Sequence, residues 1–393
     1  MKFTLSACIF LTLLSSSLQS QNFIQAYANV VNQTQQSNII SHLTDFESFG
    51  VKRRGTNSLQ NTLNWIKNEY SSYGYASTQL TENVYQNGAF NCKNLIVTKT
   101  GTVYPTTFVI ICGHYDSVSG TGTNDNGSGT AAILEVARLL QNIPTEYSIK
   151  FIHFSGEEDG LLGSEYYVNS VVNATSPKLN IKVVLNLDQV GSVAGQENNT
   201  ITCERDTSNP SSNNAASFQK TIELQNCFQL YTSLNTIIES AYGSDYVPFE
   251  NNGEIITGLF ETNESPYPHS NSDLLSNMDP VFNYNVAKGA VAAMLHYAVA
   301  NPNPLAITEF KETNQAVFYP NPAQNQLHIA FGNLETPKIN LQLIDWLGKI
   351  VLEKEFYPTA NQATIDVSTL AKGMYLARIT SANQFYSKKI VLN

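Results

Sequence analysis

Ionisable side chains stand at or shortly after the ends of three apolar runs of this sequence, and no other feature constrains its fold as strongly. Short apolar runs bounded by polar turns are typical of buried strands, and helical patterns lie between them here. Such alternation predicts an α/β fold, a mixed and mostly parallel sheet with helices on both faces. Sites in open sheets of this kind form beyond the strand ends. The residues that follow the runs are His114 with Asp116, Glu157 with Glu158, and Asp188.

Asp125 belongs to a glycine-rich loop, residues 123–129, that opens a helical pattern. Glycine tolerates backbone conformations that other residues avoid. The glycines at 127 and 129 are therefore expected to turn the chain sharply, so that the Asp125 carboxylate points inward. Ser128 is expected to cap the helix that follows, because a serine hydroxyl can accept a free N–H group of a first turn.

His269 lies in a proline-bearing loop, residues 265–273, rather than at a strand end. A single histidine in a loop is usually a surface residue, so its spacing alone says little. Neutral imidazoles and carboxylates together are nevertheless the ligands expected for catalytic zinc. Four other histidines have no comparable context and are expected to be core or surface residues: His42, His153, His296 and His328.

Five segments together resemble the ligand blocks of the M28 di-zinc aminopeptidases. The resemblance covers roughly residues 40 to 300. It implies the zinc-exopeptidase (phosphorylase/hydrolase-like) version of the α/β fold, and each block falls at a strand end or a loop-to-helix junction. The order of the blocks makes the match specific, whereas one block alone would be weak. The matching residues are 114–117, 125–129, 154–164, 186–188 and 268–270.

The resemblance also implies a ligand set for two zinc ions. It assigns His114 and Asp188 to one ion, Glu158 and His269 to the other, and Asp125 to a bridging position. Each ion would then have three protein ligands and one position open to water. Two metals about 3.5–4 Å apart can hold both oxygens of a tetrahedral intermediate.

Glu157 is implied to be the general base, which takes a proton from the zinc-bridging water. Glu158 cannot serve both roles, because coordination occupies its lone pairs. Glu-Glu pairs are common on helix surfaces, but this pair follows a strand and a Ser-Gly turn, which is poor helical context. Asp116 is expected to orient His114 through its other ring nitrogen, since residues i and i+2 of a strand point the same way. The alternative for Asp116 is a turn-forming role.

Residues 244–246 read Ser-Asp-Tyr where the family usually has Ser-Asp-His. Tyr246 stands in place of that His, so any role of that His in substrate handling does not carry over. Tyr242 or Tyr246 could donate a hydrogen bond to the oxyanion. The alternative is that these two tyrosines merely lie near the site.

The resemblance implies a secreted metallo-aminopeptidase that removes single residues from peptides with a free N-terminus. A glutaminyl cyclase shares the fold and much of the site, and it would need no hydrolytic water. The segment 125–127 and the full ligand set look more like the hydrolases. A third possibility is a non-catalytic, receptor-like ectodomain that keeps the fold without metals. The full ligand set favours the enzyme over that possibility.

Residues 1–20 are predicted to be a signal peptide, with Lys2 followed by a short apolar run. That run is too short to cross a bilayer, and no other stretch reaches ~18 apolar residues. No transmembrane segment is therefore expected. The chain carries a formal net charge of −10, and an acidic catalytic body argues against nucleic acid as a partner.

A proline-rich linker, residues 301–316, follows the catalytic domain expected over 21–300. Residues 317–393 contain six or seven short alternating runs, which predict a small β-sandwich. Its motifs resemble the type IX (Por) secretion sorting domain of Bacteroidota; the alternative is an accessory module that binds carbohydrate. The resemblance implies that the type IX machinery is a partner, and that the protein reaches the medium or the cell surface through the periplasm of a Gram-negative cell. The motifs are residues 319–323, 345–349, 365–368, 373–375 and 388–391.

Four cysteines lie beyond the signal peptide, and export makes disulfides possible. Residues 195–215 are rich in Asn, Ser and Thr and are expected to form a long excursion. A bridge between Cys203 and Cys227 is expected, because composition assigns both to a polar, loop-rich insertion. Cys92 and Cys112 flank a turn and could face each other on antiparallel strands. The alternative for that second pair is two buried free thiols.

Overall fold

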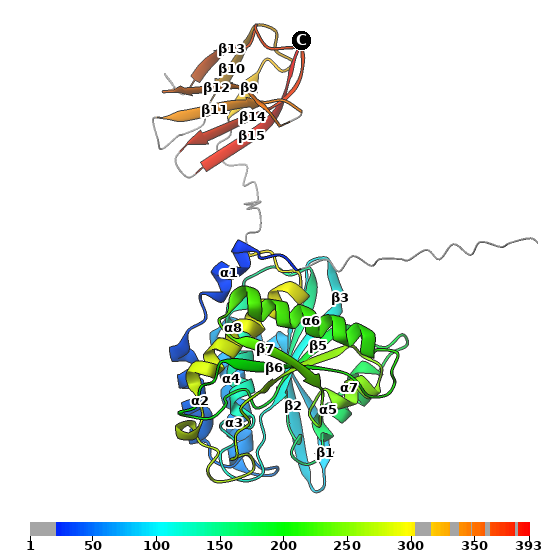
Figure 1. The fold of residues 1–393 in the computed structure, drawn as a ribbon. Helices are drawn as coiled ribbons and strands as arrows, with labels where there is room; N and C mark the ends of the chain where they lie inside the picture. Colours follow the sequence, from blue (N-terminus) through cyan, green and yellow to red (C-terminus); the bar gives the residue numbers. More distant parts are fainter. Residues whose placement is uncertain (1–20, 303–315, 331–337, 347, 358–361, 382–383) are drawn as a thin grey trace, which may run out of the picture. The chain divides into compact units, whose positions relative to one another are not determined.

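The computed structural model describes residues 21–302, 316–330, 338–346, 348–357, 362–381 and 384–393 (Figure 1). The predicted signal peptide lies outside the described residues. The chain divides into two compact units, Met1–Pro304 and Leu305–Asn393. Each unit has its own apolar core.

An eight-stranded sheet in the order β1-β2-β4-β3-β5-β8-β6-β7 forms the centre of the first unit. The four central strands β4, β3, β5 and β8 run parallel, whereas β2 and β6 are antiparallel to the central strands they adjoin. The predicted mixed, mostly parallel α/β sheet is therefore confirmed. The strands are β1 Leu80–Asn87, β2 Phe90–Lys99, β3 Tyr104–His114, β4 Tyr147–Phe154, β5 Asn180–Leu187, β6 Thr200–Arg205, β7 Asn235–Ser240 and β8 Ile256–Glu261.

Helices cover both faces of this sheet (Figure 1). Alternate residues of a strand face opposite sides, so Ile111 of β3 belongs to one core and its neighbour Ile110 to the other. The larger core packs under six helices, and the smaller one packs under α5, α7 and a short π-helical turn. The helices are α1 Gln25–Val31, α2 Gln36–Ser48, α3 Asn57–Ser72, α4 Gly127–Leu140, α5 Leu162–Tyr167, α6 Asn214–Tyr231, α7 Val247–Asn251 and α8 Pro280–Tyr297.

Two expectations about the sheet were wrong. The strands β2 and β3 are consecutive in sequence, but β4 lies between them, so Cys92 and Cys112 do not face each other across an antiparallel pair. The polar stretch 195–215 is not one long loop, because it contains β6. The inner strand β6 carries only two apolar side chains, Ile201 and Cys203. The sequence around it is polar in composition, so the strand was not predicted.

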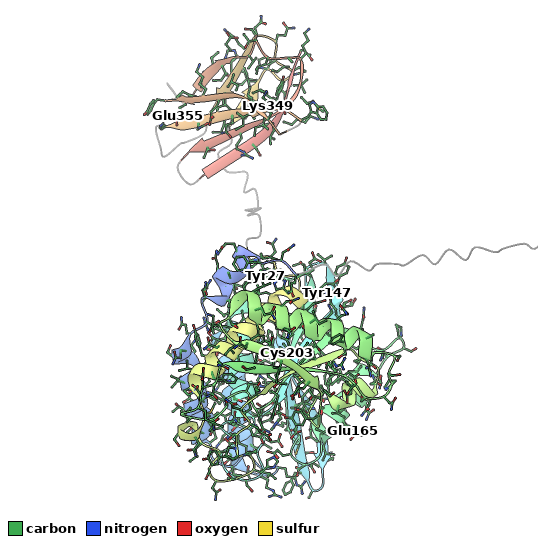
Figure 2. The ribbon with its side chains drawn as sticks, in the orientation of Figure 1. Tyr27, Tyr147, Glu165, Cys203, Lys349 and Glu355 are labelled. Atoms are coloured by element: carbon green, nitrogen blue, oxygen red, sulfur yellow. The ribbon has the colours of Figure 1, made fainter. Side chains whose placement is uncertain are left out.

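Cys203 and Cys227 are buried and free, and so are the other two cysteines of the described residues. The expected Cys203–Cys227 bridge is therefore absent. Cys203 stands on β6 inside the sheet, as Figure 2 shows, and Cys227 stands on α6. Both side chains belong to the larger core, where they act as small apolar residues. Burial raises the pKa of the Cys203 and Cys227 thiols above their ordinary value.

The described part of the second unit is all-β and holds a three-stranded sheet, β13-β10-β9, and a four-stranded sheet, β12-β11-β14-β15. Buried side chains of both sheets, such as Leu327 and Leu341, form one core, as the predicted β-sandwich requires. Within the described residues, no helix is long and apolar enough for a membrane span. The strands are β9 Val317–Tyr319, β10 Gln326–Ala330, β11 Ile339–Ile344, β12 Ile350–Phe356, β13 Gln362–Asp366, β14 Gly373–Ser381 and β15 Gln384–Leu392.

Gly289 allows α8 to approach α6, and its replacement is expected to destabilise the first unit. A Cβ at this position would lie 2.2 Å from ring atoms of the buried Phe228. Gly289→Ala should therefore lower the free energy of unfolding by about 1–3 kcal/mol, despite the better helix propensity of alanine. Urea denaturation measures this change. Gly243→Ala is the matched control, since a Cβ there meets nothing within 4 Å; equal effects of the two changes would contradict the packing argument.

Candidate metal centre

The parallel strands bring the candidate residues to one edge of the sheet. His114 is the last residue of β3 and is paired with Phe154, the last residue of β4, which leads directly into Glu157 and Glu158. Asp188 follows the end of β5. The loop before α4 carries Asp125 to the same edge. The sequence-based placement of these side chains beyond strand ends therefore matches the topology.

One group of side chains combines His114, Asp125 and Asp188, all of which are buried. The Nε2 atom of His114 lies 3.2 Å from Asp125 Oδ1 and 3.4 Å from Asp188 Oδ1. Burial alone would lower the pKa of His114, but the Asp188 and Glu157 carboxylates outweigh it and hold that pKa well above its usual value. The group therefore concentrates negative charge around one imidazole nitrogen.

A second group contains the other oxygen of Asp125 together with Glu158 and His269. The Nε2 atom of His269 lies 3.3 Å from Asp125 Oδ2 and 2.8 Å from Glu158 Oε2. The His269 side chain is 58% exposed, whereas that of Asp125 is 4% exposed. His269 also has a φ of +55°, in the left-handed region. Asp125 is the member that the two groups share.

The donor set of both groups fits a divalent cation such as zinc. In each group three ligand atoms lie within 4.8 Å of one another. Three buried ligand atoms of these two groups make no hydrogen bond with the described residues: His114 Nε2, Asp125 Oδ2 and Asp188 Oδ1. Buried polar atoms normally find a partner, and converging carboxylates without one are stabilised by a cation. Imidazole and carboxylate ligands suit zinc.

Glu157 stands beside the first group rather than within it. Its Oε2 atom lies 3.9 Å from His114 Nε2. Burial raises the pKa of Glu157 to about 10, although the nearby His114 opposes this shift, so without a bound metal ion this carboxyl group keeps its proton. A divalent cation in the first group would lower that pKa, because nearby positive charge favours the carboxylate. The same residue can then accept a proton.

Asp116 contacts both His114 and Glu157. Its carbonyl oxygen lies 3.2 Å from His114 Nδ1, and its carboxylate lies 3.6 Å from the same atom. The carboxylate also accepts the backbone N–H of Glu157 at 3.3 Å. Asp116 thus has a second contact that sequence reasoning missed, because the strand pattern says nothing about the loop after β4.

The expectations for the loop before α4 need correction. Asn126, not Ser128, caps the helix, since its side chain accepts the N–H of Gly129. The glycines at 127 and 129 lie within α4 and do not make the turn. A Cβ on Gly129 would lie 2.5 Å from Leu187 O, beside the strand end that carries Asp188. Glycine is needed there for close approach, not for backbone freedom.

Several positioning residues were missed because they contact the site only in three dimensions. The Ser244 hydroxyl donates to Asp188 Oδ2 at 2.6 Å, and Asn186 donates to Ser244 in turn. The Asp273 carboxylate accepts the backbone N–H groups of residues 124 and 125. Ser244 could have been found from the sequence, because residues 244–245 match the family's Ser-Asp motif. For Asp273 the sequence offered only its position four residues after His269.

Tyr246 cannot serve as the oxyanion donor considered above. Its hydroxyl group is buried, donates to Glu204 Oε1 at 3.0 Å and accepts the Tyr242 N–H at 2.8 Å. The substitution of Tyr for the family's His therefore creates a buried contact behind the site. Tyr242 is 41% exposed and packs edge-on against Phe260. Its hydrogen bond to the oxyanion stays a prediction.

Comparison with known families agrees with both resemblances drawn from the motifs. The model of peptidase family M28 matches residues 94–294. The model of the secretion system C-terminal sorting domain matches residues 317–393. The first match contains every candidate ligand and ends within α8.

Individual relatives give partial coverage. Aminopeptidase YwaD of Bacillus subtilis is 39% identical over 123 residues, which are 30% of this chain and 27% of that protein. The LapA aminopeptidase of Legionella pneumophila has a TM-score of 0.63 at 20% identity, over 76% of this chain and 80% of that one. A glutaminyl cyclase of Macrostomum lignano has a TM-score of 0.61 at 12% identity, over 72% of this chain and 96% of the cyclase. These structural likenesses show the fold alone.

Glu204 is expected to make stability depend on pH. Burial raises its pKa to about 8 from an ordinary 4.5. Between pH 4.5 and pH 8 the folded chain therefore keeps a proton on Glu204 that the unfolded chain has released. The stability that this carboxyl group contributes is complete below pH 4.5 and is lost as pH rises through 8. Glu204→Gln removes this titration. The fall in unfolding free energy between pH 5 and pH 8 should shrink by about 2–4 kcal/mol in urea denaturation.

The matched control is Glu223→Gln, which removes a surface carboxylate that pairs with Lys220 on α6. Its free energy of unfolding should change by less than about 0.5 kcal/mol at both pH values. An unchanged pH dependence in Glu204→Gln would show that Glu204 is ionised in the folded chain at pH 5.

Proposed function

This chain belongs to peptidase family M28, and from that membership and the geometry of its site we propose that it is a secreted di-zinc aminopeptidase. The proposal rests above all on Asp125, whose two oxygens face two different ligand groups. A single buried carboxylate shared in this way is suited to bridging two metal ions. The relatives that carry the name aminopeptidase are matched over only 17% to 27% of their own length, so the activity of the whole chain is part of the proposal.

The proposed ligands divide into two sets of three. His114, Asp125 and Asp188 would hold one zinc ion, and Asp125, Glu158 and His269 the other. Bound zinc supplies a Lewis acid, which polarises the scissile carbonyl group and makes water more acidic. Ser244 and Asp116 keep Asp188 and His114 in the orientation that the ligand role requires.

Glu157 is the proposed general base. Its carboxylate takes a proton from the attacking water and transfers it to the nitrogen of the departing amine. The Asp116 carboxylate, which accepts the Glu157 N–H, holds the main chain beneath this residue. Glu158 faces His269 and is therefore suited to the ligand role instead.

An aminopeptidase fits the charge of the site. Five carboxylates face two imidazoles. This acidic cluster would attract zinc ions and the ammonium group of a peptide N-terminus. A glutaminyl cyclase is the second candidate, because the fold is shared with one. The mass of the product separates the two reactions: hydrolysis adds water across the peptide bond, whereas cyclisation of an N-terminal glutamine loses ammonia.

The C-terminal unit is proposed to direct the protein through the type IX secretion machinery to the medium or the cell surface. The support is the sorting-domain match over residues 317–393. All candidate ligands lie before residue 270, in the other unit. The signal peptide proposed for residues 1–20 would account only for passage across the inner membrane.

Substitution of the two adjacent glutamates tests the enzymatic proposal. Glu157→Gln should keep about two zinc ions per chain but lose ~10²–10⁴-fold in turnover, because the base is gone and the ligands remain. Glu158→Gln should instead weaken zinc binding. Elemental analysis and the hydrolysis of aminoacyl-chromophore substrates measure the two effects. Loss of zinc in Glu157→Gln and retention in Glu158→Gln would reverse the roles, and a wild-type chain that binds no zinc would refute the proposal.

Truncation tests the role of the C-terminal unit. A chain that ends at Pro304 should keep its full zinc content and peptidase activity in vitro, because each unit has its own core. In the native host the same chain should accumulate in the periplasm. Activity is measured in medium, on the cell surface and in the periplasm, with the full-length chain as control. Equal release of both chains would disprove the sorting role.

A further inference from the structure

Lys52 is a buried cation that the proposed reaction does not use. It follows α2 and Gly50, and its side chain is fully buried. The Nζ atom donates to the carbonyl oxygens of Gly50 at 2.9 Å and Thr121 at 2.6 Å. It also lies 3.8 Å from the centre of the Phe46 ring, a distance at which a cation interacts favourably with the ring face.

A buried lysine is a costly way to fill this space. Moving an ammonium group out of water costs several kcal/mol unless hydrogen bonds and opposite charges compensate. Burial lowers the pKa of Lys52 to about 7, and the Asp273 and Glu47 carboxylates oppose that shift. A methionine would occupy a similar volume without this cost, so stability alone does not account for a lysine here.

The contacts of Lys52 lead to the shared ligand. Residues 117–125, here called the bridge loop, end at Asp125. The backbone of Lys52 is hydrogen-bonded to Ser117 at the start of this loop, and its ammonium group holds Thr121 in the middle. The Thr121 hydroxyl then donates to the carbonyl oxygen of Asp273, four residues after His269.

The bridge loop is also fixed from its other side. The Asp273 carboxylate accepts the N–H of Asp125 at 3.1 Å. Glu47 of α2 accepts both the Thr123 hydroxyl and the backbone N–H of Leu275. The bridge loop is therefore enclosed between α2 with its following turn and the segment that carries His269. A Cβ on Gly120 would come within 1.9 Å of Ser270 O, which shows how closely the two loops pack.

We propose that Lys52 is a positioning residue for the zinc site, and that its ammonium group fixes the bridge loop so that both oxygens of Asp125 keep their directions. The proposal rests on the proposed zinc function. Lys52 lies outside the 94–294 region that matches the family model, so the N-terminal segment contributes to the site without supplying a ligand. Partners that orient metal ligands typically affect metal affinity by 10–100-fold.

Lys52→Met tests this role, because it removes the charge and the donors but keeps most of the volume. The matched control is Lys99→Met. Lys99 is also a buried lysine, and burial lowers its pKa to about 8. It is paired with Ile149 near the start of β4, at the end of the sheet opposite Glu157, and its Nζ contacts Thr145. The two variants lose the same chemistry at two distances from the site.

Zinc retention is the first measurement. Each chain is dialysed against buffers of defined free zinc concentration, and bound zinc is found by elemental analysis. Lys52→Met should need about 10-fold more free zinc than the wild type for half-loading, whereas Lys99→Met should match the wild type. Cobalt-loaded chains give a second readout: the visible absorption bands should change in Lys52→Met only, because they report ligand geometry.

Thr121→Val covers the case in which Lys52→Met does not fold. It keeps Lys52 and removes the hydrogen bonds of the Thr121 hydroxyl to Asp273 and Thr123. Several-fold weaker zinc binding is expected, and wild-type zinc binding would count against the proposal. Wild-type zinc retention and cobalt spectra in a folded Lys52→Met chain would overturn the proposal, as would equal losses in Lys99→Met. A wild-type chain that binds zinc without cleaving peptides would refute the proposed function and leave the positioning role intact.

Discussion

The shared carboxylate of Asp125 is the interaction on which the rest of the site depends. Its two oxygens point to different imidazoles, His114 and His269, so a small rotation of this one side chain would weaken both groups together. The carboxylate is buried, and water cannot replace a misdirected oxygen. The surrounding loops must therefore hold the backbone at residue 125 to within a fraction of an ångström. The dense hydrogen bonding from Asp273 and the packing of Gly129 on Leu187 serve this requirement.

The parallel sheet solves the remaining problem of bringing distant residues together. His114 and Asp188 leave neighbouring strands at the same edge, and the pair Glu157 and Glu158 follows the next strand. Asp125 arrives in the bridge loop, and His269 arrives in a loop that no strand end fixes. Asp273, four residues later, ties that loop to the backbone of the bridge loop. One side chain thus aligns the loops of the two candidate ligand groups.

Much of this arrangement could be predicted from the sequence. Buried parallel strands are continuous apolar runs, so β3, β4 and β5 were visible, and the residues after them were the right candidates for one edge of the sheet. β6 was missed because its apolar side chains are few. The prediction of a Cys203–Cys227 bridge was wrong. The polar composition suggested an exposed insertion, but both cysteines belong to the apolar core. Nothing in the sequence indicated that Lys52 would be buried beside the site, since a lysine after a helix is ordinarily a solvated side chain.

The exposure of His269 makes the two candidate metal positions unequal. The ligands of the first group are buried, whereas the second group is open on the side of a half-exposed imidazole in a left-handed backbone conformation. Ions would enter and leave the second position on the exposed side, next to the His269 imidazole. The first position is shielded by protein. A di-zinc centre of the proposed kind would accordingly lose its ions in a fixed order. Partial depletion would give a defined one-ion species in which Asp125 is no longer shared, not a mixture of equal halves.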